Sequence, residues 1–365
     1  MTEFDIETYL NSLPEDITII NINNKNITYL PDLTRFKNLI ELDCINNKLT
    51  SLPILPDNLK KLYCSNNVLT SLPNLPDNLE KLYCPVNELK YLPILPDNLK
   101  KLYCGDNELK YLPILPDNLE ILHCDFNQLT LLPTLPDNLE NLSCDNNQLT
   151  FLPVLNEYLE DLRCFRNKLI LLPDFPQSLK VLYCFNNKLT SLPDLPNELY
   201  ELYCNNNLLT SLPILNDNLE ILHCDTNQLT TLPTLSKNLE ILYCDSNRLT
   251  YLPSLPDNLE KLCCSNNQLI TLPTFFPNML SKLKYRKNPI YEIIKTQDII
   301  IAEEKISILN KFRYLYYILK FKKQFRYWLW VRIREPKIIK TYHPNYLIEH
   351  LVNEDTDLNV VLNNW

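Results

Sequence analysis

The sequence predicts an α/β-type repeat solenoid, with a parallel β-sheet on its concave face and an extended, polyproline-like convex face. Two observations lead to this fold class. Cysteine recurs every 20 residues from Cys44 to Cys264 without a break. Asparagine follows each of these cysteines three positions later, from Asn47 to Asn267. A period of this length is typical of a solenoid, in which each repeat packs against its neighbours.

Each repeat is expected to begin with a short strand. In the repeat that starts at Leu59, Leu62 and Cys64 alternate with Lys61 and Tyr63. This is the two-residue period of a strand with one buried face. Strands of successive repeats are expected to pair in parallel, about 4.8 Å apart.

The chain is predicted to turn away from this strand at Asn67 and to return through a segment that contains Pro73 and Pro76. The Asn side chain can bond to the backbone of its own turn and the neighbouring one, which would form an asparagine ladder. The two prolines forbid a helix and favour an extended path. The second proline is replaced in three repeats, at Asn156, Asn216 and Ser236.

The repeats divide the chain into three predicted parts. Residues 1–16 form an N-terminal helical cap, residues 17–290 form a solenoid of about 14 repeats, and residues 291–365 form a basic, aromatic, helical C-terminal segment. A solenoid needs caps because its end repeats otherwise expose their apolar interior. Within the last part, Pro336 and Pro344 are expected to break the helix before a final helix at residues 346–353.

The repeat unit, Leu-x-x-Leu-x-Cys-x-x-Asn-x-Leu followed by Leu-Pro-x-Leu-Pro, resembles the leucine-rich-repeat family in its shortest class. It is similar to repeats of bacterial effector proteins, and the Leu-Tyr-Cys-x-x-Asn variant looks more like proteins of giant amoebal viruses. The resemblance covers residues 17–290 and implies a curved solenoid whose concave sheet binds protein. Some of those effectors carry a ubiquitin ligase with a catalytic cysteine. No cysteine follows Cys264, so we do not expect that activity.

Twelve of the thirteen cysteines occupy one inward-facing position of the repeat. A buried free cysteine behaves as a small apolar side chain, so we interpret this row as core filling. A disulfide chain or a metal cluster is the alternative. The disulfide chain is disfavoured because paired strands hold Cβ atoms about 4.8 Å apart, whereas a disulfide prefers ~3.8 Å. Cys-x-x-Cys pairs are also absent from the sequence. Cys263 occupies an outward position and is expected to be the one reachable thiol.

The outward strand positions form a tyrosine-rich column, which we predict to be a protein-binding surface. The candidate residues are Tyr63, Tyr83, Tyr103, His123, Arg163, Tyr183, Phe185, Tyr203, His223 and Tyr243. Tyrosine offers a large, rigid contact area with a polar tip. The alternative interpretation is that neighbouring tyrosines pack on one another and only stabilise the sheet.

Two strands that are 100 residues apart carry nearly the same sequence, with His123 and Asp125 in one and His223 and Asp225 in the other. A cluster of histidine and carboxylates suits a metal site or acid–base catalysis. Duplication of five repeats explains the similarity of the two strands without any function. An open sheet also provides no pocket for a substrate. The chain's single glycine excludes Gly-rich phosphate loops. We therefore predict no enzyme, metal, cofactor or small-molecule substrate.

Charge is distributed unevenly along the chain. Its net charge of −9 combines −16 in residues 1–280 with +7 in residues 281–365. Basic residues among aromatic ones at 311–340 suit a nucleic acid or an anionic membrane surface, which is the alternative function. A solvated face of the cap is the simpler interpretation. The candidate docking residues are Lys320, Lys322, Lys323, Arg326, Arg332 and Arg334.

The sequence favours an intracellular protein that acts as a non-enzymatic interaction scaffold. The first residues lack the basic flank and apolar run of a secretory signal. No apolar stretch is long enough for a transmembrane helix. The regular cysteines suit free thiols in a reducing compartment. With the viral resemblance, the expected setting is the host cytoplasm and the expected partner is a host protein.

Overall fold

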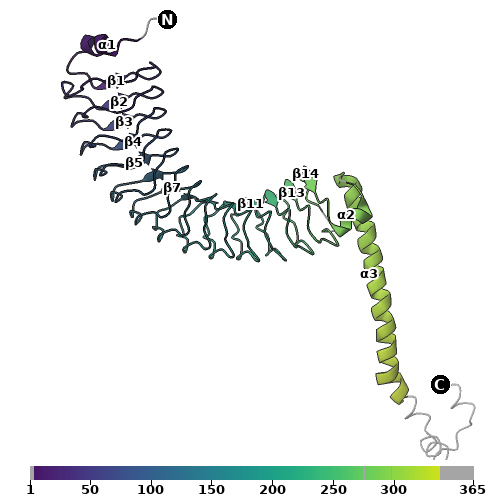
Figure 1. Cartoon of the computed structure of the whole chain (residues 1–365). Coiled ribbons are helices and arrows are strands. Elements are labelled where there is room, and N and C mark those ends of the chain that lie inside the picture. Colours follow the sequence, from purple (N-terminus) through teal and green to yellow (C-terminus); the bar gives the residue numbers. More distant parts are fainter. Residues whose placement is uncertain (1–3, 274–275, 279, 297, 338–365) are drawn as a thin grey trace, which may run out of the picture. The chain divides into compact units, whose positions relative to one another are not determined.

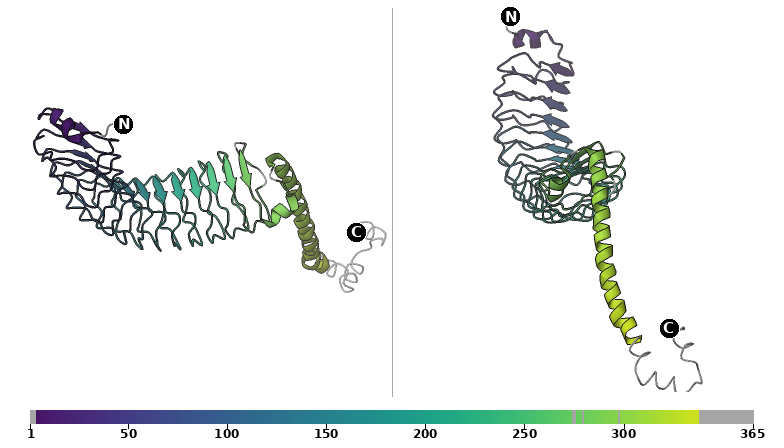
Figure 2. Two further views of the ribbon diagram at one scale, coloured as in Figure 1. Left: turned by 45° about the horizontal axis from the view of Figure 1, so that its top comes forward. Right: turned by 90° about the vertical axis from the view of Figure 1, so that its right-hand side faces the viewer.

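The computed structural model describes residues 4–273, 276–278, 280–296 and 298–337. The chain forms two compact units, Met1–Ala302 and Glu303–Trp365. Over its described residues, the first unit is a curved solenoid built on one sheet of 14 strands, which follow one another in sequence order (Figure 1). The sheet lies on the inner side of the curve (Figure 2). The predicted fold class is therefore confirmed.

Every strand is three residues long and pairs in parallel with the next strand in the chain. The strands are β1 (Ile19–Asn21), β2 (Glu41–Asp43), β3 (Lys61–Tyr63), β4 (Lys81–Tyr83), β5 (Lys101–Tyr103), β6 (Ile121–His123), β7 (Asn141–Ser143), β8 (Asp161–Arg163), β9 (Val181–Tyr183), β10 (Glu201–Tyr203), β11 (Ile221–His223), β12 (Ile241–Tyr243), β13 (Lys261–Cys263) and β14 (Lys282–Lys284). Equivalent residues of neighbouring repeats face each other, so each repeat position becomes a column along the solenoid.

The row of twelve inward cysteines lies inside the solenoid as buried free thiols. Some of them donate weak hydrogen bonds to the next strand, as Cys44 Sγ does to the Tyr63 carbonyl at 3.3 Å. Burial raises the pKa of Cys44 and of Cys84 to about 12. The thiols therefore stay uncharged and act as small apolar side chains, which confirms their interpretation as core filling.

The expectation that Cys263 would be reachable is wrong. Its side chain is on the outward face of β13, yet the residue is only 3% exposed. In the register of the sheet it lies between Tyr243 and Lys284, which are much longer. A short side chain between two long ones is covered by them, as Ser143 is between His123 and Arg163.

The predicted asparagine ladder runs through the turns after the strands. In one rung, Asn147 Oδ1 accepts a hydrogen bond from the Leu129 N–H at 2.9 Å. Its Nδ2 donates to the carbonyls of Cys124, Cys144 and Asp145 at 3.0–3.1 Å. The same pattern begins at Asn47 and extends to Asn288. Each amide thus joins its own turn to the repeat before it, which confirms the ladder.

In the residues that the structure describes, the return segments contain no helix or strand, as the prolines predict. A second row of asparagines bonds them together on the outer side. In this row, Asn138 Nδ2 donates to the Asp117 carbonyl at 3.0 Å. Where the second proline is missing, a polar side chain bonds to the preceding repeat instead: Asn156 and Asn216 reach the carbonyls of Pro136 and Pro196, both at 2.6 Å. At these positions a hydrogen bond between repeats thus replaces the restriction that proline places on the backbone.

Short helices lie at both ends of the repeats. Helix α1 (Ile6–Ser12) buries Ile6 and Leu10. Its first turn is capped by Asp5, whose Oδ1 accepts from the Thr8 N–H at 3.1 Å. Helix α2 (Pro289–Ile294) buries Ile290 and Ile294. We propose that these helices cover the apolar ends of the stack, as the sequence-based division into parts implies.

Helix α3 (Ile299–Leu329) continues into a π-helical turn, η1 (Trp330–Arg334). The predicted break at Pro336 is wrong, because the backbone stays helical through Lys337. Proline lacks an N–H and its ring crowds the carbonyl four residues earlier. We attribute its tolerance here to the wider π turn just before it. Pro344 and the helix predicted at 346–353 lie outside the described residues. None of the helices described is long and apolar enough to cross a bilayer.

Candidate protein-binding surface

The last residue of each strand faces outward. In two runs of consecutive strands this residue carries an aromatic ring, and the rings form two columns. The first aromatic column consists of Tyr63, Tyr83, Tyr103 and His123, on β3 to β6. Its successive ring centroids are 6.2, 5.1 and 4.8 Å apart. These separations are those of favourable aromatic pairs. The parallel register therefore turns a single repeat position into a continuous row of rings.

The second aromatic column lies farther along the same face, on β9 to β12. It consists of Tyr183, Tyr203, His223 and Tyr243. Its centroid separations are 4.5, 4.2 and 4.4 Å, so it is packed more tightly than the first column.

A further ring pair stands beside the second column. Phe165 and Phe185 stack at 4.3 Å with an angle of 9° between their planes. Phe185 was predicted from the sequence and Phe165 was not. The signal for Phe165 was its place at the same repeat position as Phe185, one repeat earlier.

The rings of both columns are half-buried. Their contacts with one another agree with the interpretation that they stabilise the sheet. The same contacts fix the side chains while leaving part of each ring open to solvent. Because a partner would then immobilise few rotamers, such a surface suits binding as well.

Two strands with polar outward residues, β7 and β8, separate the two columns. Arg163 forms two-pronged hydrogen bonds with Asp161, at 2.9 Å from Nη2 and 3.1 Å from Nε. Its guanidinium also lies 5.2 Å from the ring centroid of Tyr183, a cation–π distance. Ser143, on the preceding strand, is buried. Arg163 therefore provides an exposed, oriented positive charge between the columns.

The two columns differ in the charges beside them. Beside the first, Lys81 Nζ lies 5.0 Å from the ring centroid of Tyr63 and 5.7 Å from that of Tyr103. In the second, the Tyr183 hydroxyl donates to Glu201 Oε2 at 2.6 Å. Burial and this hydrogen bond raise the pKa of Tyr183, so it stays a donor. The second column also has a basic group at each end, Arg163 beside Tyr183 and Lys282, whose Nζ donates to the Tyr243 hydroxyl at 3.2 Å. The first column thus has a basic contact, and the second has an acidic contact between two basic ends.

His123 and His223 are members of the columns, and Asp125 and Asp225 follow them two residues later in a partly desolvated setting. Burial, together with the charge of Asp145, raises the pKa of Asp125 to about 6. Burial also raises the pKa of Asp225 to about 6 and lowers that of His223 to about 4. Near neutral pH the histidine is therefore uncharged. In the part of the chain that the structure describes, no three His, Cys, Asp or Glu side chains are grouped to hold a metal ion.

The chain's only glycine stands beside Asp125. A Cβ atom at Gly105 would lie 2.9 Å from both carboxylate oxygens of Asp125, closer than real Cβ contacts. Gly105 therefore makes room for this carboxylate and does not serve a turn, since its φ is not positive.

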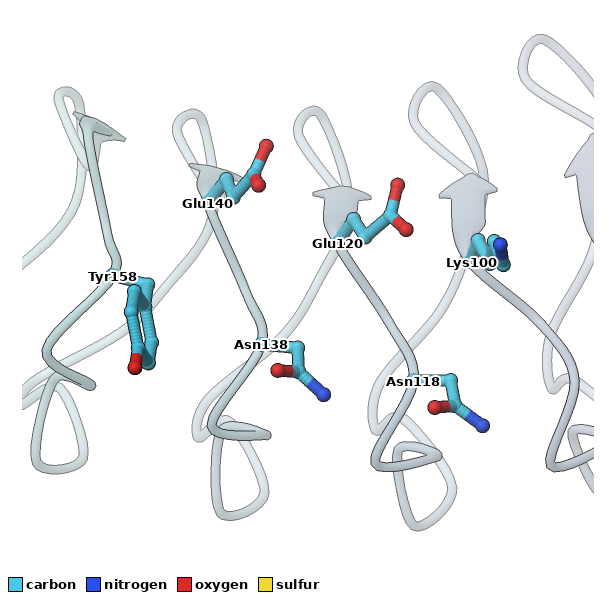
Figure 3. Close-up of a pocket in the computed structure, with 6 residues that line it drawn as sticks. All are labelled: Lys100, Asn118, Glu120, Asn138, Glu140 and Tyr158. Carbon is cyan, nitrogen blue, oxygen red and sulfur yellow. The ribbon is translucent and has the colours of Figure 1, made fainter.

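A polar depression on the flank of the solenoid was not foreseen. Figure 3 shows its lining: Lys100, Asn118, Glu120, Asn138, Glu140 and Tyr158. It forms where Tyr158 interrupts the outer asparagine row. Small-molecule sites are mostly apolar with a few polar groups. This lining is almost entirely polar, so we do not assign it a ligand.

An apolar row on the outer side was also missed. Large apolar side chains follow one another at the same position of five consecutive repeats, and all are about half exposed: Tyr91, Tyr111, Leu131, Phe151 and Leu171. Two further side chains near this row, Ile94 and Ile114, are 88% exposed. The sequence signal was an apolar residue before the first Leu-Pro of each of these repeats, where most other repeats have Ser or Thr.

The predicted basic residues of the C-terminal segment lie on α3 and η1. Lys320, Lys322, Lys323, Arg326, Arg332 and Arg334 are all exposed. Their role in docking stays a prediction.

Solved structures with the same architecture carry similar sequences. YopM from Yersinia enterocolitica is 36% identical, with a TM-score of 0.68 over 74% of this chain. The leucine-rich effector YopM from Yersinia pestis is 35% identical, with a TM-score of 0.67 over 80% of this chain and 87% of that one. A leucine-rich-repeat protein from Leptospira interrogans is 29% identical, with a TM-score of 0.59 over 74% of this chain and 78% of that one.

The chain belongs to the leucine-rich-repeat family. No protein-family model and no curated protein sequence matches it. This leucine-rich-repeat protein spans 65% of the length of the Y. enterocolitica YopM.

Proposed function

We propose that this leucine-rich-repeat protein is a non-enzymatic scaffold that binds a protein partner on the aromatic columns of its concave face. The observation that carries the proposal is the pair of half-buried columns, whose ring centroids are 4.2–6.2 Å apart. Tyrosine-rich, pre-organised surfaces bind with little loss of side-chain entropy. The exposed Arg163 between the columns adds a charge of the kind enriched at binding hot spots.

Two more distant structures with this fold support a protein as the ligand class. Toll was solved in complex with Spatzle, and the leucine-rich repeats of FLRT2 in an octameric complex with Latrophilin 3 and Unc5D. We carry over only the class of partner.

The setting of the protein is part of the proposal. Thirteen free, buried cysteines suit a reducing compartment. We therefore propose an intracellular protein. Its resemblance to giant amoebal virus proteins makes a viral protein that engages a host component in the cytoplasm the specific version of this hypothesis.

The test compares two triple variants. Tyr183, Tyr203 and Tyr243 are changed to Ser in one, and Tyr91, Tyr111 and Tyr251, which are half exposed on the outer side, are changed to Ser in the other. Proteins captured from the natural cell by the wild type are identified, purified and titrated against all three forms. Because a single hot-spot side chain contributes about 2 kcal/mol or more, the concave variant should bind at least ~30-fold more weakly.

The outer variant should bind like the wild type. Equal affinity of all three forms would refute the concave surface as the binding site, and equal loss in both variants would point to a general effect on the fold. Circular dichroism of each variant shows whether the solenoid is intact.

A second candidate function belongs to α3. Between Lys305 and Arg334 the chain has nine Lys and Arg and no Asp or Glu. We propose that this segment binds a polyanionic surface, either a nucleic acid or an anionic membrane.

A further inference from the structure

We propose that α3 lies along an anionic phospholipid surface and contacts it through an aromatic strip that contains no charged residue. This inference rests on the proposed function of α3, polyanion binding, and specifies the polyanion as anionic lipid. The strip consists of Tyr314, Tyr317, Phe321, Phe325 and Trp328. Their spacing of three, four, four and three residues places them on one face of the helix.

The strip is open to solvent along its whole length. Each of its side chains is at least half exposed. Neighbouring rings pack along the helix axis: Tyr317 and Phe321 stack at 6.5 Å, and Phe325 and Trp328 at 5.7 Å. Phe321, Phe325 and Trp328 line one shallow hollow together with Gln324. Exposed apolar area of this kind is costly in water and marks a surface that another phase or partner covers.

The charge around the strip is complementary to anionic lipid. Lys320, Lys322, Lys323 and Arg326 are exposed and lie at helix positions outside the strip. Their long side chains can reach headgroup phosphates while the rings enter the interface. Aromatic rings next to basic residues are typical of helices that lie in the plane of a membrane surface.

The apolar side chains of α3 favour lipid over nucleic acid. Leu315, Ile318 and Leu319 are exposed on the same helix, Ile318 next to the strip and Leu315 and Leu319 farther round the helix. Nucleic acids bind Lys and Arg through phosphates and stack aromatic rings on unpaired bases, but they offer aliphatic side chains little cover. The acyl boundary of a membrane covers both kinds of apolar side chain. Since α3 is not apolar enough to span a bilayer, lengthwise binding is the arrangement that suits its composition.

The test uses the full chain and its own fluorescence. The protein has three tryptophans, so W330F and W365F together leave Trp328 as the only one. This form is titrated with phosphatidylcholine vesicles, with and without phosphatidylserine. We expect binding only with phosphatidylserine, weakening as salt is added, and a blue shift of the Trp328 emission.

Three variants of the single-tryptophan form distinguish the contribution of the basic residues from that of the aromatic strip. Replacing Lys320, Lys322, Lys323 and Arg326 by Gln should weaken binding on the order of 100-fold or more, at about fivefold per basic residue. Replacing Tyr317, Phe321 and Phe325 by Ser should abolish the blue shift. The matched control replaces Phe312, Tyr316 and Tyr327 by Ser. These aromatic residues are as exposed but lie on other faces of α3, so the control should keep the blue shift.

Competing outcomes are distinct. Binding of single-stranded RNA or duplex DNA without binding of phosphatidylserine vesicles would overturn the lipid assignment and keep the polyanion proposal. Binding of neither would overturn both. Equal loss in the strip variant and its control would refute the strip as the lipid-facing side. A dimer in sedimentation that only the strip variant dissociates, without effect on vesicle binding, would show that a second copy covers the strip.

Discussion

At the scale of single residues, the turn after each strand depends on one residue in the left-handed region of backbone conformation. This position comes two residues after each inward cysteine and has φ of 48–57° from Asn46 to Asn266. Glycine, the usual choice, is absent from it. Asparagine tolerates this conformation because its side chain bonds locally. Val86 and Thr226 do not share this advantage, and their β-branched side chains make the conformation costly.

The first prediction concerns Val86. Its φ is 57°, so V86N should raise the free energy of unfolding by about 1 kcal/mol. The reverse change one repeat earlier, N66V, should lower it by a similar amount. Urea unfolding at constant temperature measures both, and a loss of stability in V86N would contradict the argument.

The second prediction concerns pH. Burial is the main cause that raises the pKa of Asp125 and Asp225 from 3.8 to about 6. A carboxyl group with a raised folded-state pKa contributes stability that is present below its ordinary pKa and is lost as pH rises through about 6. The double variant D125N/D225N should therefore be more stable than the wild type near pH 7, and this advantage should vanish towards pH 4.

Thermal unfolding across this pH range checks the prediction. The control D97N/D117N removes the same number of carboxylates from exposed outer turns. A gain that is independent of pH, or one that the control shares, would mean that net charge and not burial is responsible.

At the scale of elements, repeats are joined by two rows of asparagine that differ in burial. The inner row bonds both amide atoms inside the turns, whereas the outer row makes a single bond to the preceding repeat at the surface. Loss of a buried amide leaves buried backbone groups without partners, at about 1–3 kcal/mol each. Loss of an exposed one allows water to replace it.

The third prediction follows from this contrast. N147A removes four hydrogen bonds of a buried amide and should destabilise the protein by at least ~3 kcal/mol. N138A removes one exposed bond and should cost ~1 kcal/mol or less. Chemical unfolding of the two variants gives the comparison, and equal losses would show that the inner row is not the main link between repeats.

The repeat pattern predicted the features that recur in every repeat, including the parallel pairing and the asparagine ladder, but not the features that depend on which side chains are neighbours at one place. The alternation of Leu62 and Cys64 with polar neighbours, and the place of Asn67, follow from periods of two and twenty residues. The burial of Cys263 depends on Tyr243 and Lys284, which are far away in the chain. The outer asparagine row joins residues 21 apart. Such relations require the register of the sheet, which the sequence pattern alone does not fix.

The candidate site was likewise predictable only in part. The aromatic positions followed from alternation, since outward residues of a strand share a face. The split into two columns with different borders, and the stacking of Phe165 on Phe185, came from side-chain directions across strands. The outer apolar row was missed because its segments are neither helix nor strand, so no local alternation assigns their side chains to a face.

At the scale of the whole molecule, the inward cysteines form one row along the solenoid that is closed to solvent from end to end. The fourth prediction is that a native thiol titration with a bulky reagent will detect close to none of the thirteen cysteines, Cys263 included. After denaturation all thirteen should react. One fast thiol in the native protein, lost in C263S, would restore the expectation that Cys263 is reachable.

The parallel register also gives the solenoid a fixed unit of length. Each repeat adds one strand, about 4.8 Å, to the sheet. The two aromatic columns start at Tyr63 and Tyr183, and six repeats of 20 residues separate them. Inserting or deleting one whole repeat between them would change their separation by a single strand spacing and leave every other contact in phase. For the binding function that we propose, the number of repeats would therefore set which partners can bridge both columns, and gene duplication would tune affinity without altering any contacting residue.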